Sequence, residues 1–282
     1  MASRLVPFFA QIGLTPNAVS ITGMLFGIFA SFAYYRYLDL RFAIAGFALM
    51  IAWHVMDGAD GQLARLTRSQ SHFGKVLDGI SDIVTFLAVY TALAIALSRK
   101  HGDWMYALVA LSAVCHAVQS ATYEAQRQEY DYLGWGRKPQ GPPPSGRVER
   151  DGEDLPVIRR LFDFLDRLFF EGLSFPGAGI RRKFRETMAA ALQRQPERTV
   201  LIHQRYRETL APQLRRWSIL SANYRTLGIF IAALLKAPEY YFGFEIVGFS
   251  AVLAVLIWRL SASYEAFPAS AASSEPAAGQ TL

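Results

Sequence analysis

Long apolar blocks separated by short polar turns dominate the first half of the chain and return near its end. About 20 helical residues are needed to cross the hydrocarbon core of a bilayer, so blocks of this kind are typical of transmembrane helices. The blocks predict six spans, at about 17–37, 42–56, 83–98, 104–123, 219–235 and 244–260. The sequence therefore predicts an all-α membrane protein with six transmembrane helices.

The second and third apolar runs are too short to cross a bilayer on their own. Each helix is expected to extend into its acidic flank, which reads DGADGQLAR after Met56 and GKVLDGISD before Ile83. The aspartates of both flanks would then lie at the membrane boundary or just inside it. Ionisable side chains are costly there, so we interpret them as a functional site.

Composition and charge support this reading. The chain is 52% hydrophobic and only 18% charged, against about 25% charged residues in soluble domains. Arginine and lysine gather in the turn between the second and third spans and after the fourth span. The positive-inside rule then places that turn, the functional site beside it and both termini in the cytoplasm. The net charge of +6 indicates a lipid-facing cytoplasmic surface, and no nucleic acid partner is expected.

Three parts are expected along the chain. Residues 1–124 would hold an N-terminal interfacial helix and the first four spans, and residues 217–282 the last two spans and a flexible tail. Residues 125–216 would be a helical cytoplasmic insertion between the fourth and fifth spans. Within it, 134–147 reads as a Pro/Gly-rich loop. The amphipathic stretch 155–170 suits either the membrane surface or packing on the bundle.

Four aspartates follow a helical spacing. Asp57 and Asp60 are three residues apart, and Asp78 and Asp82 are four apart, so each pair shares a helical face. If the helices form an antiparallel hairpin around 66–73, Asp57 lies at the depth of Asp82, and Asp60 at the depth of Asp78. The four carboxylates would converge on a small volume. Such a cluster requires counter-charge, and its hard oxygen ligands favour Mg²⁺, Mn²⁺ or Ca²⁺.

Small residues line the same stretch. They allow close helix packing, or leave room for a nucleotide against the backbone. They are Gly58, Gly61, Ala64, Gly74 and Gly79.

The stretch from Asp57 to Asp82 resembles the signature of the CDP-alcohol phosphotransferase family, D-x-x-D-G-x-x-A-R, eight residues, then G-x-x-x-D-x-x-x-D. All eight fixed positions are present. The Thr15-Pro16-Asn17 sequence before the first span is also similar to the family. The resemblance implies an enzyme of phospholipid biosynthesis that moves a phosphatidyl group from CDP-diacylglycerol to the hydroxyl of a small polar acceptor and releases CMP.

The resemblance also implies residue roles. A two-metal site of Mg²⁺ or Mn²⁺ would be held by Asp57, Asp60 and Asp78, with Asp82 contributing. Asp82 is in addition the expected catalytic base, which deprotonates the acceptor hydroxyl. The expected CDP-binding residues are Gly61, Ala64, Arg65 and Gly74.

Inositol or inositol phosphate is the expected acceptor. Lys75 and Arg225 offer positive charge for it, and the segment 64–74 is somewhat similar to phosphatidylinositol-type enzymes. Arg225 could equally snorkel to the membrane interface. His54, one turn before Asp57, either orients a metal ligand or is a structural histidine.

Several alternatives stay open. The donor could be CDP-choline or CDP-ethanolamine, with diacylglycerol as the acceptor. A cation transporter would need acidic residues near mid-membrane, and a catalytically dead scaffold would have lost a signature residue. Expected partners are a CDP-linked lipid donor, a small hydroxyl acceptor and membrane lipids, and a homodimer is possible.

Overall fold

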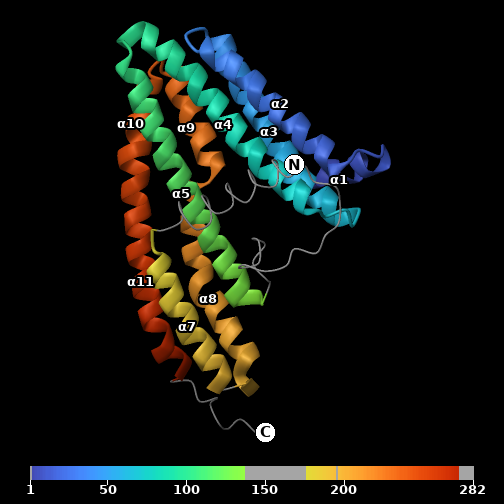
Figure 1. Ribbon diagram of the computed structural model, residues 1–282, viewed down its shortest axis with the longest axis vertical. Coiled ribbons are helices and arrows are strands. Elements are labelled where there is room, and N and C mark those ends of the chain that lie inside the picture. The colour runs from blue at the N-terminus through green and yellow to red at the C-terminus, as the bar shows by residue number, and fades with distance from the viewer. Residues whose placement is uncertain (1, 137–175, 195, 273–282) are drawn as a thin grey trace, which may run out of the picture. The chain divides into compact units, whose positions relative to one another are not determined.

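The structure is a computed structural model that describes residues 2–136, 176–194 and 196–272 (Figure 1). These residues form helices and turns, with no β-strand among them, in agreement with the all-α prediction. The amphipathic stretch 155–170 and most of the loop 134–147 lie outside the described residues.

The chain forms two compact units. Unit 1 comprises Met1–Cys115 and Ala222–Val247, and unit 2 comprises His116–Ser221 and Gly248–Leu282. The helices of unit 1 are α1 (Ala2–Gln11), α2 (Pro16–Tyr35), α3 (Leu40–Leu66), α4 (His72–His101), the first part of α5 (Trp104–Trp135), α9 (Ala222–Leu234) and α10 (Pro238–Phe244). Unit 2 holds the rest of α5, then α7 (Ala178–Arg194), η2 (Pro196–Arg198), α8 (Thr199–Trp217), η3 (Ser218–Leu220) and α11 (Ser250–Ala272). The π-helical turn η4 (Glu245–Phe249) joins α10 to α11.

Helix α2 begins where the sequence predicts. Thr15 is its N-cap, and the Thr15 hydroxyl accepts a hydrogen bond from the backbone N–H of Ala18 at 3.2 Å. Pro16 stands in the first turn, where its missing N–H removes no helical hydrogen bond.

Helices α3 and α4 both extend into the acidic flanks, as expected. Helix α3 runs through Asp57 and Asp60 and ends at Leu66. After a short turn, Ser71 caps α4 by accepting a hydrogen bond from Gly74 N–H at 3.0 Å. In Figure 1 the two helices lie side by side with α2. The polar flanks are therefore parts of the long helices and not separate loops.

Glycines allow the helices of unit 1 to approach closely. A Cβ added to Gly27 in α2 would overlap the side chain of Thr85 in α4. A Cβ at Gly46 in α3 would lie 3.1 Å from the ring of Tyr34 in α2. Helix α2 thus packs on both of its neighbours at backbone distance, as in small-residue contacts between membrane helices.

Unit 1 buries one apolar face and exposes another. Trp53 is 1% exposed and meets the ring of Phe86 edge-on at 5.4 Å. Phe29, Phe32 and Leu87 are more than half exposed on the outer faces of α2 and α4. Exposed apolar patches of this kind indicate contact with lipid.

Five helical segments among the described residues are long and apolar enough to cross a membrane, which indicates an integral membrane protein. They are Pro16–Tyr35, Leu40–Leu66, Leu77–His101, Trp104–Trp135 and Pro238–Phe267. The expected span at 219–235 corresponds to α9, which has 13 residues. A helix of that length reaches only roughly 20 Å, so α9 does not count among the five.

Unit 2 has a core of its own, rich in aromatic rings. Phe184 of α7 stacks on Tyr264 of α11 with ring centroids 3.9 Å apart. Tyr206 of α8 is fully buried beside them, and burial raises the pKa of its phenol well above the ordinary value. Tyr206 therefore stays neutral and acts in packing.

Candidate active site

The α3–α4 hairpin places the four signature aspartates within electrostatic reach of one another. The charges of Asp57, Asp78 and Asp60 all act on Asp82, that of Asp57 most strongly. Asp60 in turn is acted on by Asp78. Aspartates of α3 thus interact with aspartates of α4, while the pairing by depth stays a prediction.

Asp60 is buried and hydrogen-bonded through both carboxylate oxygens. It is 5% exposed. Its Oδ2 accepts a hydrogen bond from the hydroxyl of Ser20 in α2, and its Oδ1 accepts one from the backbone N–H of Gly61, each at 2.5 Å. The hydroxyl of Ser81 in α4 donates to the Ser20 carbonyl at 3.5 Å. Three helices thus meet at this carboxylate.

Ser20 did not figure in the sequence-based site. The only signal that could have found it is its position in α2, five residues after the N-cap Thr15. Its contact with Asp60 spans 40 residues of sequence, and such a pairing depends on how α2 packs against α3.

The expected CDP-binding residues lie along the same hairpin. The guanidinium of Arg65 lies 3.8 Å from where a Cβ of Gly61 would be, and its charge acts on Asp60. A Cβ at Gly74 would lie 3.3 Å from the side-chain oxygen of Asn17, at the start of α2. Ala64 is half-buried on α3. The first turn of α2 therefore borders the signature segment.

The donor set suits a hard divalent cation. It consists of carboxylate oxygens, and Oδ1 of Asp82 is buried without a hydrogen-bond partner among the described residues. A buried carboxylate oxygen without a donor is costly, and a cation would satisfy it. No group of three His, Cys, Asp or Glu side chains in the described part of the chain is arranged to hold a metal ion. A Mg²⁺ site does not require three protein ligands, because Mg²⁺ commonly uses one or two carboxylates plus water and substrate phosphates. The residues therefore fit this ion.

Arg225 is buried rather than at the interface. Its side chain is 0% exposed and forms an ion pair with Glu245. The same carboxylate accepts hydrogen bonds from Tyr241 at 2.9 Å, from Tyr90 at 2.6 Å and from Ser112. The Arg225 side chain therefore does not snorkel to the membrane interface. The charge of Arg225 is already shared with Glu245. A role of Arg225 in binding the acceptor stays a prediction.

His54 connects α3 to α9. Its Nε2 lies 2.9 Å from the hydroxyl of Thr226, the residue after Arg225. This contact fixes the ring one turn before Asp57. Lys75, the other expected acceptor residue, lies in the first turn of α4.

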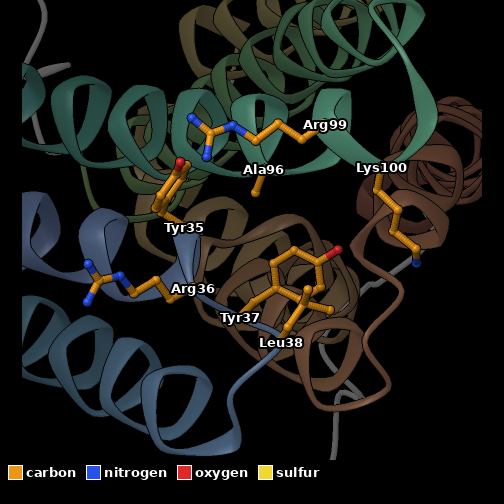
Figure 2. Close-up of a pocket in the computed structure, with 7 residues that line it drawn as sticks. All are labelled: Tyr35, Arg36, Tyr37, Leu38, Ala96, Arg99 and Lys100. Carbon is orange, nitrogen blue, oxygen red and sulfur yellow. The ribbon is translucent and has the colours of Figure 1, made fainter.

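A cavity of about 420 Å³ lies at the other end of α2 and α4 (Figure 2). It is lined by Tyr35, Arg36, Tyr37, Leu38, Ala96, Arg99 and Lys100. The guanidinium of Arg99 stands over the ring of Tyr35, 5.2 Å from its centroid, and Figure 2 shows the two side by side. Ser20 and Tyr35 are separated by roughly 22 Å of helix, so this cavity is not part of the aspartate site.

Comparison with known proteins matches the segment that carries this site. Residues 13–140 match the model of the family described as CDP-alcohol phosphatidyltransferase. A protein of Mycobacterium bovis named CDP-diacylglycerol–serine O-phosphatidyltransferase is 29% identical over 129 residues, which cover 42% of this chain and 40% of that protein. Archaetidylinositol phosphate synthase of Pyrococcus horikoshii is 32% identical over 92 residues, which cover 33% of this chain and 47% of that protein.

An uncharacterized protein of Aquifex aeolicus is 27% identical over 132 residues, covering 47% of this chain and 65% of that protein. The aligned stretches thus span less than two thirds of each of these relatives. The matched range contains α2, α3, α4 and the whole signature segment. The chain therefore carries, at residues 13–140, a domain of the CDP-alcohol phosphatidyltransferase family of enzymes.

Proposed function

We propose that this protein transfers a phosphatidyl group from CDP-diacylglycerol to the hydroxyl of inositol or inositol phosphate and releases CMP. The observation that carries the proposal is the family match at residues 13–140, which includes the hairpin with four mutually interacting aspartates. The similarity to a protein named archaetidylinositol phosphate synthase favours an inositol-type acceptor.

The reaction needs a base and a place for the diphosphate. In the proposed step the acceptor oxygen attacks the phosphatidyl phosphorus, and the bond from that phosphorus to the oxygen of CMP breaks. The hydroxyl proton passes to the carboxylate of Asp82, and CMP leaves with the electron pair. Support for Asp82 as the base is its buried oxygen, which has no hydrogen-bond partner among the described residues.

Enzymes of this family are generally divalent-metal dependent. We propose a two-metal site in which Asp57, Asp60 and Asp78, with Asp82, hold Mg²⁺ or Mn²⁺. Bound cations would neutralise the charge of the CDP diphosphate. The backbone at Gly61, Ala64 and Gly74, with the Arg65 guanidinium, would border the nucleotide.

We further propose that the chain spans the membrane six times, with α9 as the short additional span. The aspartate-bearing turn, the 125–216 insertion and both termini would then be cytoplasmic, in accord with the positive-inside rule. Helix α1 would lie in the membrane interface. Its Val6 and Phe9 pack in the core with Val19, Ala59 and Leu63, while its Phe8, and Ile12 just after the helix, are more than half exposed.

Serine is the second candidate acceptor, because the mycobacterial relative is named for transfer to serine. In the deciding experiment, the purified protein is incubated with Mg²⁺, CDP-diacylglycerol and one acceptor at a time: inositol, inositol phosphate, serine or glycerol 3-phosphate. CMP release and the lipid product are both measured. We expect turnover with inositol or its phosphate and none in excess EDTA.

Three outcomes would contradict parts of the proposal. Turnover with serine alone would replace the acceptor and keep the donor. Turnover only from CDP-choline or CDP-ethanolamine to diacylglycerol would overturn the donor. Full turnover in EDTA would exclude the two-metal site.

A further inference from the structure

Helices α7 and α8 lie beyond the segment that matches the family, and they carry an unusual charge. Ten of the residues between 178 and 217 are arginine or lysine, and three are glutamate. The excess of seven positive charges is larger than the net charge of +6 of the whole chain. The rest of the protein is therefore close to neutral, and its basic character resides in this helical hairpin.

Six arginine and lysine side chains in the described part of unit 2 are exposed and form no ion pair with a described residue, and five of them lie near one end of the α7–α8 hairpin, away from Arg194. These five are Arg182 and Lys183 in α7, Arg215 and Arg216 in α8, and Arg259 in α11, and we call them the basic collar. None of them forms an ion pair with a described residue. Arg185 differs, because it is bound to Glu129 through two hydrogen bonds. The charge of the collar is thus available to a partner outside the described chain.

The membrane boundary can be located within unit 2. Helix α5 reaches Tyr123 after a length that crosses the hydrocarbon core, and the ion pair of Glu124 and Arg127 follows at 2.9 Å. In α11, Trp258 is 69% exposed and directly precedes Arg259. Exposed tryptophan followed by arginine is typical of the interface. Both helices therefore leave the apolar layer at these residues.

Hydrogen bonds join α5 to α11 on either side of the two boundaries, so the boundaries lie between the same two contacts. Gln119 donates to Ser250 at 3.0 Å, and Gln126 donates to the hydroxyl of Tyr264 at 3.2 Å. Tyr123 lies about midway between the two glutamines, and Trp258 about midway between Ser250 and Tyr264.

The collar lies at the same depth, just outside the apolar layer. Phe184, which follows Lys183, stacks on Tyr264. Gln213, close to Arg215, donates to Ser263. Ser263 and Tyr264 lie one turn beyond Arg259 in α11. The cations of α7, α8 and α11 therefore stand at the depth of the lipid headgroups.

The cations point outward in different directions. The buried faces of α7, α8 and α11 meet in one core through Phe184, Leu210 and Leu260, so the exposed faces turn away from one another. A nucleic acid would require the cations on a single face. A headgroup layer surrounds the protein and can meet them all.

We propose that the basic collar binds the anionic headgroups of phospholipids in the surrounding leaflet. The α7–α8 hairpin would thereby be held against the membrane surface and would gather anionic lipid around unit 2. This inference does not depend on the identity of the acceptor or on catalysis.

The experiment counts lipids retained by the full chain. Protein is exchanged into a mixture of phosphatidylglycerol and phosphatidylcholine, without CDP-lipid, and bound lipids are counted by native mass spectrometry. We expect the variant R215Q/R216Q to retain roughly threefold less phosphatidylglycerol than the wild type, with phosphatidylcholine unchanged. The matched control is R194Q/R198Q, which removes two arginines of the same hairpin at its other end. It should retain phosphatidylglycerol like the wild type.

A second measurement covers the case in which a variant fails to fold. Phosphatidylglycerol retained by the wild type should fall at high salt, because ions screen contacts between exposed charges. Salt-independent retention, or equal loss in the collar and control variants, would overturn the proposal. So would a collar variant that keeps its phosphatidylglycerol but loses affinity for an added short RNA, since the partner would then be nucleic acid.

Discussion

The four signature aspartates differ in how their oxygens are satisfied. Both oxygens of Asp60 accept hydrogen bonds, from Ser20 and from the backbone of Gly61. Asp82 keeps a buried oxygen without a hydrogen-bond partner among the described residues. A carboxylate fixed on both sides suits a metal ligand, and one with an unsatisfied oxygen can take either a cation or the proton of an acceptor hydroxyl.

Asp82→Asn and Asp60→Asn should therefore separate binding from turnover. Asp60→Asn is expected to weaken metal-dependent binding of CDP-diacylglycerol. Asp82→Asn should spare that binding and lower turnover by about 10² to 10⁴, the usual contribution of a general base. Calorimetric titration and CMP release measure the two effects. If the Asp82 variant binds normally and turns over at nearly the normal rate, another group is the base.

Ser20→Ala should reach the site through Asp60. The alanine removes the donor to Oδ2, and loss of a hydrogen bond to a metal ligand typically costs about 10- to 100-fold in metal affinity or activity. The control is Ser31→Ala in the same helix, whose hydroxyl donates only to the Ile28 carbonyl. We expect the Mg²⁺ concentration at half-maximal activity to rise for Ser20→Ala and to stay unchanged for the control. Equal effects would mean that Ser20 has no special link to the metal.

At the scale of elements, one buried carboxylate connects four helical segments of unit 1. Glu245, at the start of the π-helical turn, accepts hydrogen bonds from α4, α5, α9 and α10 through Tyr90, Ser112, Arg225 and Tyr241. All of its acceptor positions are in use. Such a carboxylate holds the helices together, because moving Arg225 would leave a buried charge uncompensated and moving any of the three hydroxyls would cost a hydrogen bond to a charged group.

Glu245→Ala should destabilise the protein by about 3–5 kcal/mol, because it leaves the Arg225 charge buried and unpaired. The double variant Arg225→Met/Glu245→Met should recover much of this loss. Glu239→Ala in α10 is the control, since its partners Lys100 and His101 are partly exposed and such pairs are worth about 0–1 kcal/mol. Thermal unfolding in detergent measures all three. A Glu245→Ala protein as stable as the wild type would show that the ion pair contributes no net stability.

At the scale of the whole molecule, sidedness follows from the charge distribution. The turn between α3 and α4 carries the aspartates, and the turn between α4 and α5 lies at the other end of α4. Since Cys115 is the only cysteine, a Cys115→Ser background allows single cysteines at Ser69 and Asp103. We expect an impermeant maleimide to label Ser69→Cys from the cytoplasmic side and Asp103→Cys from the opposite side. Labelling of both from one side would contradict the predicted orientation.

The sequence by itself determined the helical class and the position of the four aspartates on two consecutive helices joined by a short turn. These depend on contacts within about one turn of helix or across one short loop, where spacing translates directly into position. The extension of both apolar runs into their acidic flanks followed from the thickness of the bilayer. The places of Thr15 and Pro16 at the start of α2 fit the local chemistry of a helix N-terminus.

Only the tertiary structure decided which residues from distant helices meet. The contact of Ser20 with Asp60, the pairing of Arg225 with Glu245 and that of His54 with Thr226 join helices far apart in the chain. Each is set by which faces of two helices pack together, and local spacing does not encode this choice. The sequence pattern could not distinguish a snorkelling Arg225 from a buried one, because burial of its charge depends on a carboxylate 20 residues away.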